Sequence, residues 1–304
     1  MNPDISLIFC SRYSRLSENL IDNIAKTIGC SYELIAVDNS KGKYSISEAY
    51  QVGFERSKGE FLVFLHDDIA FHTYSWGALL KEHLSEPGTG ICGIGGRDTI
   101  VRIPSSWKVS LPYIHLTQSD KTGQSRRIKH RPAGFTGTKF PVIMLDGVFL
   151  SMHRTLLDHF SFDIGLKGFH AYDFDSCIRS ASAGFQNYVI YNIDIEHFSK
   201  GSPDKSYYQS LIQVFRNHRE HLPLSVKTLN PAQLRKLEKS GLNRLIRKML
   251  VKGFDTDEIM QVYIEFSELI SKSQKKSMYF RCKRRYLQTI IIFIRLLIQK
   301  LNKK

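Results

Sequence analysis

Cysteine is scarce in this sequence, with five residues in 304. Their number is odd and their spacing matches no zinc-binding pattern, so neither a disulfide framework nor a structural zinc site is expected. Several lie within apolar runs, where a free cysteine behaves as a small buried hydrophobic residue. The pattern indicates a protein of a reducing compartment. The five are Cys10, Cys30, Cys92, Cys177 and Cys282.

Long apolar runs are also missing. No uncharged apolar stretch reaches the length that a membrane-spanning helix needs. Met1 to Asp4 has neither a basic region nor a long apolar core, so no secretory signal is expected. The segment Ile5 to Arg15 contains no glycine, which argues against a sugar nucleotidyltransferase, a class that normally carries a glycine-rich N-terminal signature. No internal repeat and no nucleic-acid-binding motif is present.

Positive charge is plentiful but unevenly placed. The formal net charge is +14, and Pro231 to Lys304 holds 18 Lys and Arg residues against 6 Asp and Glu. The preceding three quarters hold 25 basic and 23 acidic residues and are nearly neutral. The length suits one large domain with an appendage. We expect a main domain over residues 1–203 and a basic helical extension over residues 204–304.

The first hundred residues alternate between strand-like and helix-like segments. This alternation predicts an α/β fold with a mostly parallel sheet flanked by helices. The expected strands are Ile5–Cys10, Tyr32–Val37, Phe61–Leu65 and Gly90–Ile94, and later Val142–Leu150 and Asn187–Ile193. The expected helices are Leu16–Ile28, Ser45–Ser57, Trp76–Leu84 and Phe174–Ala183, with helical structure from Ser206 onward.

Arg97 to Phe140 differs from this pattern, since it is long, polar and basic, with scattered Gly and Pro. We expect a weakly structured insertion, which in a compact domain is usually functional or mobile. Trp107 and Tyr113 within it, and Trp76 before it, are candidate aromatic stacking surfaces for a ligand. For Trp76, packing in the core of a helical segment is favoured over stacking on a ligand. For Trp107, packing and stacking are equally favoured.

The strand Phe61–Leu65 ends in His66, Asp67 and Asp68. A continuous apolar run indicates a strand buried on both faces, and ligands bind at the carboxyl end of such strands. Two carboxylates there are oxygen ligands for a divalent cation. The alternative is a solvated turn, although no Gly or Pro interrupts the segment.

Three further polar sites lie at or near predicted strand and helix ends. Asp38 follows a strand and could accept hydrogen bonds from a nucleotide, or could cap a turn. Asp173 and Asp175 lie at a helix start, where an acidic cap is the ordinary alternative. His197 follows the last strand and becomes a metal ligand only if the other sites converge on it.

In this order and spacing, the segments resemble glycosyltransferase family 2, of GT-A type, in its bacterial branch with His-x-Asp in place of Asp-x-Asp. The resemblance covers roughly Ile5 to Ser202. It rests on the segments Glu33–Asn39, Ser57–Asp68, Leu145–Phe149 with Arg154, Tyr172–Asp175 and Glu196–His197.

The resemblance implies a role for each matching residue. Asp173 matches the general base of inverting members, and Asp68 and His197 match the metal ligands, for Mg²⁺ or Mn²⁺. The implied donor-binding residues are Ser11, Arg12, Asp38, Asn39, His66 and Asp67. The implied pocket for the sugar and acceptor contains Trp107, Asp146, Gly147 and Tyr172. His66 replaces an acid and Tyr172 replaces the usual Glu, which leaves the metal requirement and the sugar specificity open.

The implied activity is transfer of a sugar from a nucleoside-diphosphate donor, commonly a UDP-sugar, to a saccharide or lipid-linked acceptor in bacterial surface polysaccharide synthesis. The leaving diphosphate needs a cation to offset its charge. The incoming hydroxyl has a high pKa and needs a base, for which we expect Asp173. A single base opposite the leaving group gives inversion.

The C-terminal segment Tyr279–Lys304 has apolar residues at helical spacing beside the basic run Arg281–Arg285. It is typical of an interfacial helix on an anionic membrane, and the alternative is a helix packed on the core or on another subunit. We therefore expect a cytoplasmic protein at the inner face of the cell membrane, with no nucleic-acid partner. The competing function is a non-catalytic transferase-like module that binds lipid or nucleic acid through this tail.

Overall fold

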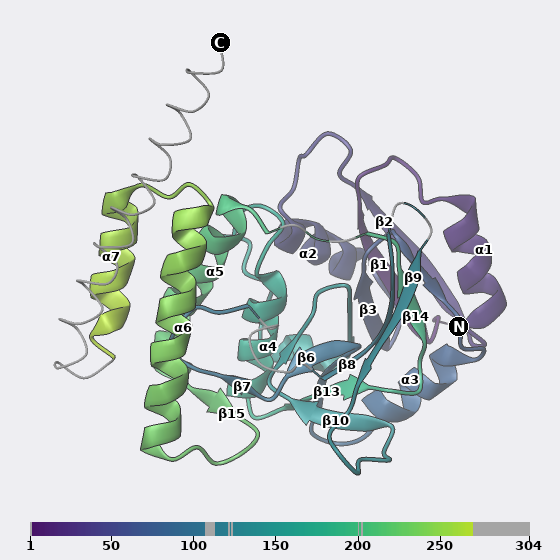
Figure 1. Cartoon of the computed structure of the whole chain (residues 1–304). Helices are drawn as coiled ribbons and strands as arrows, with labels where there is room; N and C mark the ends of the chain where they lie inside the picture. The colour runs from purple at the N-terminus through teal and green to yellow at the C-terminus, as the bar shows by residue number, and fades with distance from the viewer. Residues whose placement is uncertain are drawn as a thin grey trace. The chain divides into compact units, whose positions relative to one another are not determined.

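The computed structural model describes residues 2–106, 113–120, 122, 124–199, 201 and 203–269. Trp107, Cys282 and the segment Tyr279–Lys304 lie outside the described residues. The chain forms two compact units (Figure 1). Of the described residues, one unit comprises those up to 101 and from 105 to 229, and the other comprises residues 102–104 and 230–269.

A seven-stranded sheet forms the centre of the first unit, in the order β10-β13-β5-β12-β3-β1-β2. The neighbours β1–β2, β1–β3 and β13–β5 are parallel, whereas β12 and β10 run antiparallel to their neighbours. The α/β fold expected from the sequence is confirmed. The strands are β1 (Ile5–Ser11), β2 (Tyr32–Asp38), β3 (Phe61–Leu65), β5 (Thr89–Gly93), β10 (Lys139–Val142), β12 (Phe149–His153) and β13 (Gln186–Ile190).

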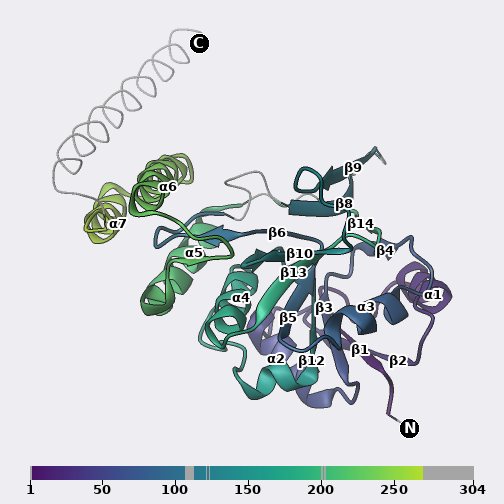
Figure 2. The same cartoon turned by 90° about the horizontal axis from the view of Figure 1, so that it is seen from below.

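Helices cover both faces of this sheet, α1 (Glu18–Thr27) and α3 (Trp76–Leu84) on one side, and α2 (Ile46–Arg56) and α4 (Tyr172–Ser182) on the other (Figures 1 and 2). Ser45 and Glu48 form a capping box that begins α2. In α3, Trp76 is fully buried and stacks on Phe71 with 4.0 Å between ring centroids. Trp76 is thus a core residue, as the favoured alternative predicted.

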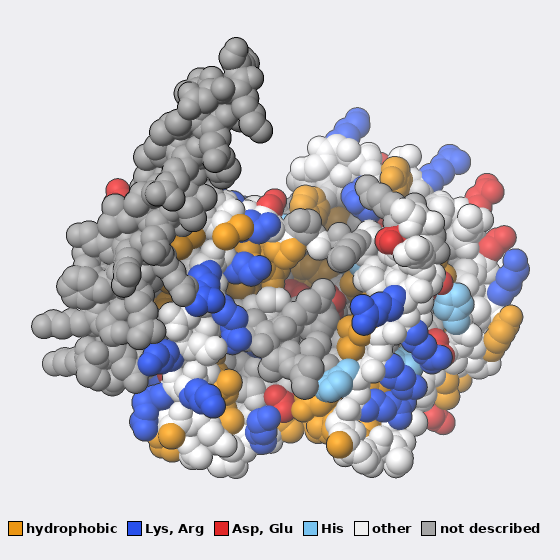
Figure 3. Space-filling model, viewed as in Figure 1, with side chains coloured by type: hydrophobic (Ala, Val, Ile, Leu, Met, Phe, Trp, Pro, Cys, Tyr) orange, Lys and Arg blue, Asp and Glu red, His pale blue; other side chains and the backbone are white. Residues whose placement is uncertain are grey.

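The segment from Arg97 to Phe140 is not a weakly structured insertion in its described part, and that expectation is wrong. Tyr113 to His130 forms a hairpin of β8 (Tyr113–Ser119) and β9 (Ser125–His130). Its strand character is hidden in the sequence because β9 lies outermost and carries the exposed residues Arg126, Arg127 and Lys129, which suit a sheet edge. Lys and Arg side chains gather on the face of the molecule seen in Figure 3.

This hairpin belongs to a second sheet of the first unit, in the order β11-β6-β8-β14-β4, with β9 paired to β8. A third, two-stranded sheet pairs β15 with β7. The remaining strands are β4 (Ile69–Phe71), β6 (Gly95–Arg97), β7 (Thr99–Ile100), β11 (Met144–Leu145), β14 (Ile195–His197) and β15 (Leu224–Ser225).

Two 3₁₀ helices, Arg154–Asp158 and Arg219–His221, and the helix α5 (Lys205–Asn217) complete the first unit. In the second unit, α6 (Pro231–Val251) starts at the capping box of Asn230 and Gln233, and α7 is Thr256–Ser267. The side chain of Glu238 is fully buried and pairs with Arg102 at 2.6 Å. Among the described helices, none is both long and apolar enough to cross a bilayer.

Candidate functional site

The ends of three parallel strands bring the first group of predicted residues to one edge of the main sheet. Ser11 is paired in register with Asp38, and Phe9 with Leu65, the residue before His66. Phe61 to Leu65 is at most 5% exposed, so the strand before the His66–Asp68 cluster is buried as expected. The core thereby fixes where the polar residues emerge.

The second sheet brings His197 to this edge, more than a hundred residues along the chain. β4 begins directly after Asp68 and pairs antiparallel with β14, with Ile69 opposite His197. The N–H of Phe198 donates to the carbonyl of Asp68 at 2.9 Å, which holds the two strand ends together.

His66, Asp68 and His197 form a group that suits a metal ion. Their ligand atoms all lie within 4.8 Å of one another. Oδ1 of Asp68 is 3.3 Å from Nε2 of His197 and 3.8 Å from Nδ1 of His66. The structure brings His197 next to Asp68, which was the condition for reading His197 as a metal ligand. His66 was expected to contact the donor, and it lies among these candidate ligands.

The pKa shifts of Asp68 and His66 also suit a cation. Partial burial alone would raise the pKa of Asp68, but hydrogen bonds from His197 and Ser199 hold it well below its usual range. Burial, together with the neighbouring His197, lowers the pKa of His66. A carboxylate and a neutral imidazole are the forms that bind metal.

Asp67 points to a different set of partners. Its Oδ2 accepts a hydrogen bond from the buried hydroxyl of Ser11 at 3.0 Å, and its Oδ1 lies 3.8 Å from Nη2 of Arg12. The same Arg12 nitrogen is 3.9 Å from Oδ2 of Asp68. The Arg12 side chain is 71% exposed, and its guanidinium lies within 4 Å of both carboxylates.

Asp38 and Asn39 organise the loop after β2. The exposed Asp38 accepts the N–H of Ser40 at 2.9 Å, and the buried Asn39 exchanges two hydrogen bonds with the backbone of Tyr44. The turn-capping alternative for Asp38 is present in the structure, and its carboxylate also faces solvent at the strand end.

Asp173 lies in the first turn of α4, beside Asp146 and Gly147. Its Oδ2 accepts the N–H of Gly147 at 3.2 Å and its Oδ1 accepts the N–H of Phe174 at 3.0 Å. Removal from water and the negative charge of Asp146 raise the pKa of Asp173 to about 7, against the effect of these two donors. A carboxylate with such a pKa suits proton transfer near neutral pH.

The residue before α4 is strained. Ala171 has φ 63°, in the left-handed region that non-glycine residues rarely adopt. Such strain costs about 1–3 kcal/mol and clusters at functional sites. It sets the direction in which Tyr172 and Asp173 leave the preceding loop.

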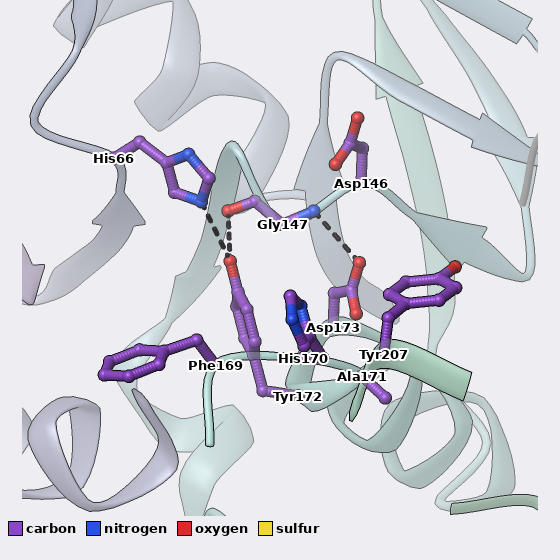
Figure 4. Close-up of a pocket in the computed structure, with 9 residues that line it drawn as sticks. All are labelled: His66, Asp146, Gly147, Phe169, His170, Ala171, Tyr172, Asp173 and Tyr207. Atoms are coloured by element: carbon purple, nitrogen blue, oxygen red, sulfur yellow. Dashed lines mark hydrogen bonds between the residues drawn. The ribbon is translucent and has the colours of Figure 1, made fainter. Parts of the chain in front are cut away.

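Asp173, Asp146, Gly147, His66 and Tyr172 line one pocket of about 140 Å³ (Figure 4). The pocket also contains four residues that the sequence analysis missed: Phe169, His170, Ala171 and Tyr207. The first three directly precede the Tyr172–Asp175 motif, so proximity was an available signal. Tyr207 lies in α5, where nothing in the local pattern marks it.

Two other candidates have structural partners. Asp175 is buried and bonds His218 at 2.6 Å and Arg179 at 2.7 Å, so its contacts link α4 to the residue that follows α5 rather than line the pocket. The Tyr113 hydroxyl donates to Asp98 at 3.1 Å and its ring packs on Phe140.

Comparisons with known proteins give one family and one described structural match. A family model described as "Glycosyltransferase like family" matches residues 6–219. A crystal structure of GalNAc-T7 with UDP, GalNAc and Mn2+ is similar at 11% identity and a TM-score of 0.49, covering 88% of this chain and 55% of the other. The chain thus spans little more than half of that protein's length. No curated protein matches.

Proposed function

Since this chain belongs to the glycosyltransferase-like family, we propose that it is an inverting enzyme that moves a sugar from a nucleoside diphosphate, UDP by preference, to a saccharide or lipid-linked acceptor. The observation that carries the proposal is the pocket in which His66, one of three candidate metal ligands, lies across from the carboxylate of Asp173. A cation site and a base of raised pKa on one pocket are what this displacement requires.

The metal part of the proposal assigns His66, Asp68 and His197 as ligands. Two imidazoles with one carboxylate favour Mn²⁺ over Mg²⁺, because Mg²⁺ prefers oxygen ligands. When bound, the ion supplies positive charge against the negative charge that develops on the leaving diphosphate. Arg12 lies beside Asp67 and Asp68 and adds a second positive charge at the same edge.

The base is Asp173. Hydrogen bonds from the Gly147 and Phe174 N–H groups fix its two carboxylate oxygens, one each, and no side chain among the described residues forms an ion pair with it. As the acceptor hydroxyl attacks the anomeric carbon, its proton passes to Asp173 and the diphosphate leaves from the opposite face. One such displacement inverts the anomeric configuration.

The proposed acceptor site rests on one aromatic side chain at the pocket. Phe169 is 50% exposed at the pocket and offers an apolar ring face to a sugar. A lipid-linked acceptor, peripheral membrane contact and a role in surface polysaccharide synthesis rest on the segment Tyr279–Lys304, which lies outside the described residues. Unchanged membrane partitioning after its deletion would remove that support.

The test is a panel of nucleotide sugars with Mn²⁺, Mg²⁺ or chelator, scored by release of the nucleoside diphosphate. We expect hydrolysis of one donor, dependent on the metal and abolished in Asp68→Ala. Asp173→Asn should keep donor binding and lose about 10²–10⁴-fold in turnover. The matched control is Asp158→Asn, which changes an exposed carboxylate of the 3₁₀ helix Arg154–Asp158.

Two results would refute the proposal. If Asp173→Asn turned over at the wild-type rate, Asp173 would not be the general base. Binding to anionic lipid without binding to any donor nucleotide would favour the non-catalytic module instead. Retention of the donor's anomeric configuration in the product, read by NMR, would contradict the inverting step alone.

A further inference from the structure

Tyr172 connects the candidate metal group to the pocket that contains Asp173. Its hydroxyl lies 3.2 Å from Nε2 of His66 and 2.9 Å from the carbonyl oxygen of Gly147 (Figure 4). The residue is 5% exposed, and its ring meets Tyr50 edge-on at 5.5 Å between centroids. A buried ring held in this way offers little surface to a sugar, so a different role is needed for its hydroxyl.

The directions of these hydrogen bonds follow from the groups involved. A backbone carbonyl only accepts, so the single proton of the Tyr172 hydroxyl goes to the oxygen of Gly147. The hydroxyl oxygen is then free to accept from Nε2 of His66, and we infer that the imidazole proton is on Nε2. In a neutral imidazole the other nitrogen carries the free lone pair. That nitrogen, Nδ1, is the one 3.8 Å from Oδ1 of Asp68.

We propose that Tyr172 is a positioning residue that fixes the ring orientation and the tautomer of His66, so that Nδ1 serves as the third protein ligand of the metal. The inference rests on the proposed metal-dependent transfer and adds the residue that prepares the site. Outer hydrogen bonds of this kind fix the tautomer of metal-binding histidines in general.

The contact between Tyr172 and the carbonyl of Gly147 depends on glycine at position 147. A Cβ at position 147 would collide with the hydroxyl and ring of Tyr172, so only glycine lets the tyrosine reach the carbonyl. The N–H of the same residue donates to Asp173. Gly147 therefore orients Asp173 through its N–H and Tyr172 through its carbonyl, and Tyr172 and Asp173 are consecutive in α4.

The experiment compares Tyr172→Phe with wild type by two readouts that do not require turnover. The first is Mn²⁺ affinity, from titration calorimetry and from the EPR signal of free Mn²⁺. We expect Tyr172→Phe to weaken binding by about 10–100-fold, the usual effect of removing such a partner. The second is the His66 tautomer in the metal-free protein, from long-range ¹H–¹⁵N NMR assigned with His66→Asn. Wild type should carry the proton on Nε2, and Tyr172→Phe should show a mixture.

The matched control is Tyr191→Phe. Tyr191 is also buried, and its hydroxyl donates to the carbonyl of His130 at 3.0 Å, in a contact that involves none of the three candidate ligands. It should leave both readouts unchanged. Gly147→Ala keeps the tyrosine hydroxyl but displaces it, and should weaken Mn²⁺ binding as Tyr172→Phe does.

The outcomes separate this inference from the function on which it rests. Wild type that binds no Mn²⁺ refutes the proposed metal site, and the inference with it. Wild type that binds Mn²⁺ while Tyr172→Phe binds equally well, with the same tautomer, overturns the inference alone. Equal losses in Tyr172→Phe and Tyr191→Phe would also overturn it, because the effect would then be general to buried hydroxyls.

Discussion

The sharpest prediction concerns the pH dependence of turnover, because the base has an unusual pKa. Asp173 accepts a proton only as a carboxylate, and its pKa is raised to about 7 by removal from water and by Asp146. Activity should therefore be flat above pH 8 and fall as the pH drops. At pH 6 about a tenth of the enzyme has the ionised carboxylate, so the rate should be roughly tenfold lower than on the plateau.

The assay is release of nucleoside diphosphate from the active donor between pH 5 and pH 8.5, at fixed free Mn²⁺. Asp146→Asn removes the second cause of the raised pKa while burial remains, so its inflection should move to lower pH. At pH 6 the variant should retain a larger fraction of its own plateau rate than wild type does. Asp158→Asn should leave the inflection unchanged.

The reasoning fails if the wild-type rate is constant from pH 8 down to pH 5. It also fails if the inflection stays near pH 7 in Asp146→Asn, since a group other than Asp173 would then be titrating.

Further predictions follow from the same contacts. Asp173→Asn should raise the melting temperature at pH 8, where wild type bears the cost of an ionised buried carboxylate, on the order of a few kcal/mol, and should add little near pH 4, where the folded-state carboxyl is protonated. Asp68→Ala should abolish Mn²⁺-induced thermal stabilisation, because it removes the carboxylate of the three-ligand group. Phe169→Ala should raise the KM for the acceptor several-fold and leave donor hydrolysis unchanged, since the ring lines the pocket and Phe169 is none of the three candidate metal ligands. Calorimetry, fluorescence-monitored melting and initial rates check these in turn.

Local pattern predicted the strands and helices of the N-terminal half closely. The continuous apolar run before His66 indicated a strand buried on both faces, and the expected helix began at Ser45, which is the N-cap of α2. The same method failed for the β8–β9 hairpin. An edge strand is buried on one side at most, so its exposed basic residues outweigh the weak apolar signal.

The family resemblance grouped Asp68, His197 and Asp173 as a set, and the structure brings His197 to Asp68 while placing Asp173 on a pocket with His66. It did not indicate that His66 joins the candidate metal ligands, because the geometry of an imidazole depends on what its other nitrogen contacts. Nor did it find Tyr207, which reaches the pocket only through the packing of α5.

The sequence by itself determined the strands and helices of the first hundred residues, and which polar groups emerge at their ends, since these depend on residues close together in the chain. Only the tertiary structure decided the pairing of β4 with β14, the shared pocket of Asp146 and Asp173, and the contact of Tyr172 with His66. These join residues about thirty to a hundred and thirty positions apart, and their proximity depends on how the sheets pack. The raised pKa of Asp173 and the orientation of His66 are consequences of that packing.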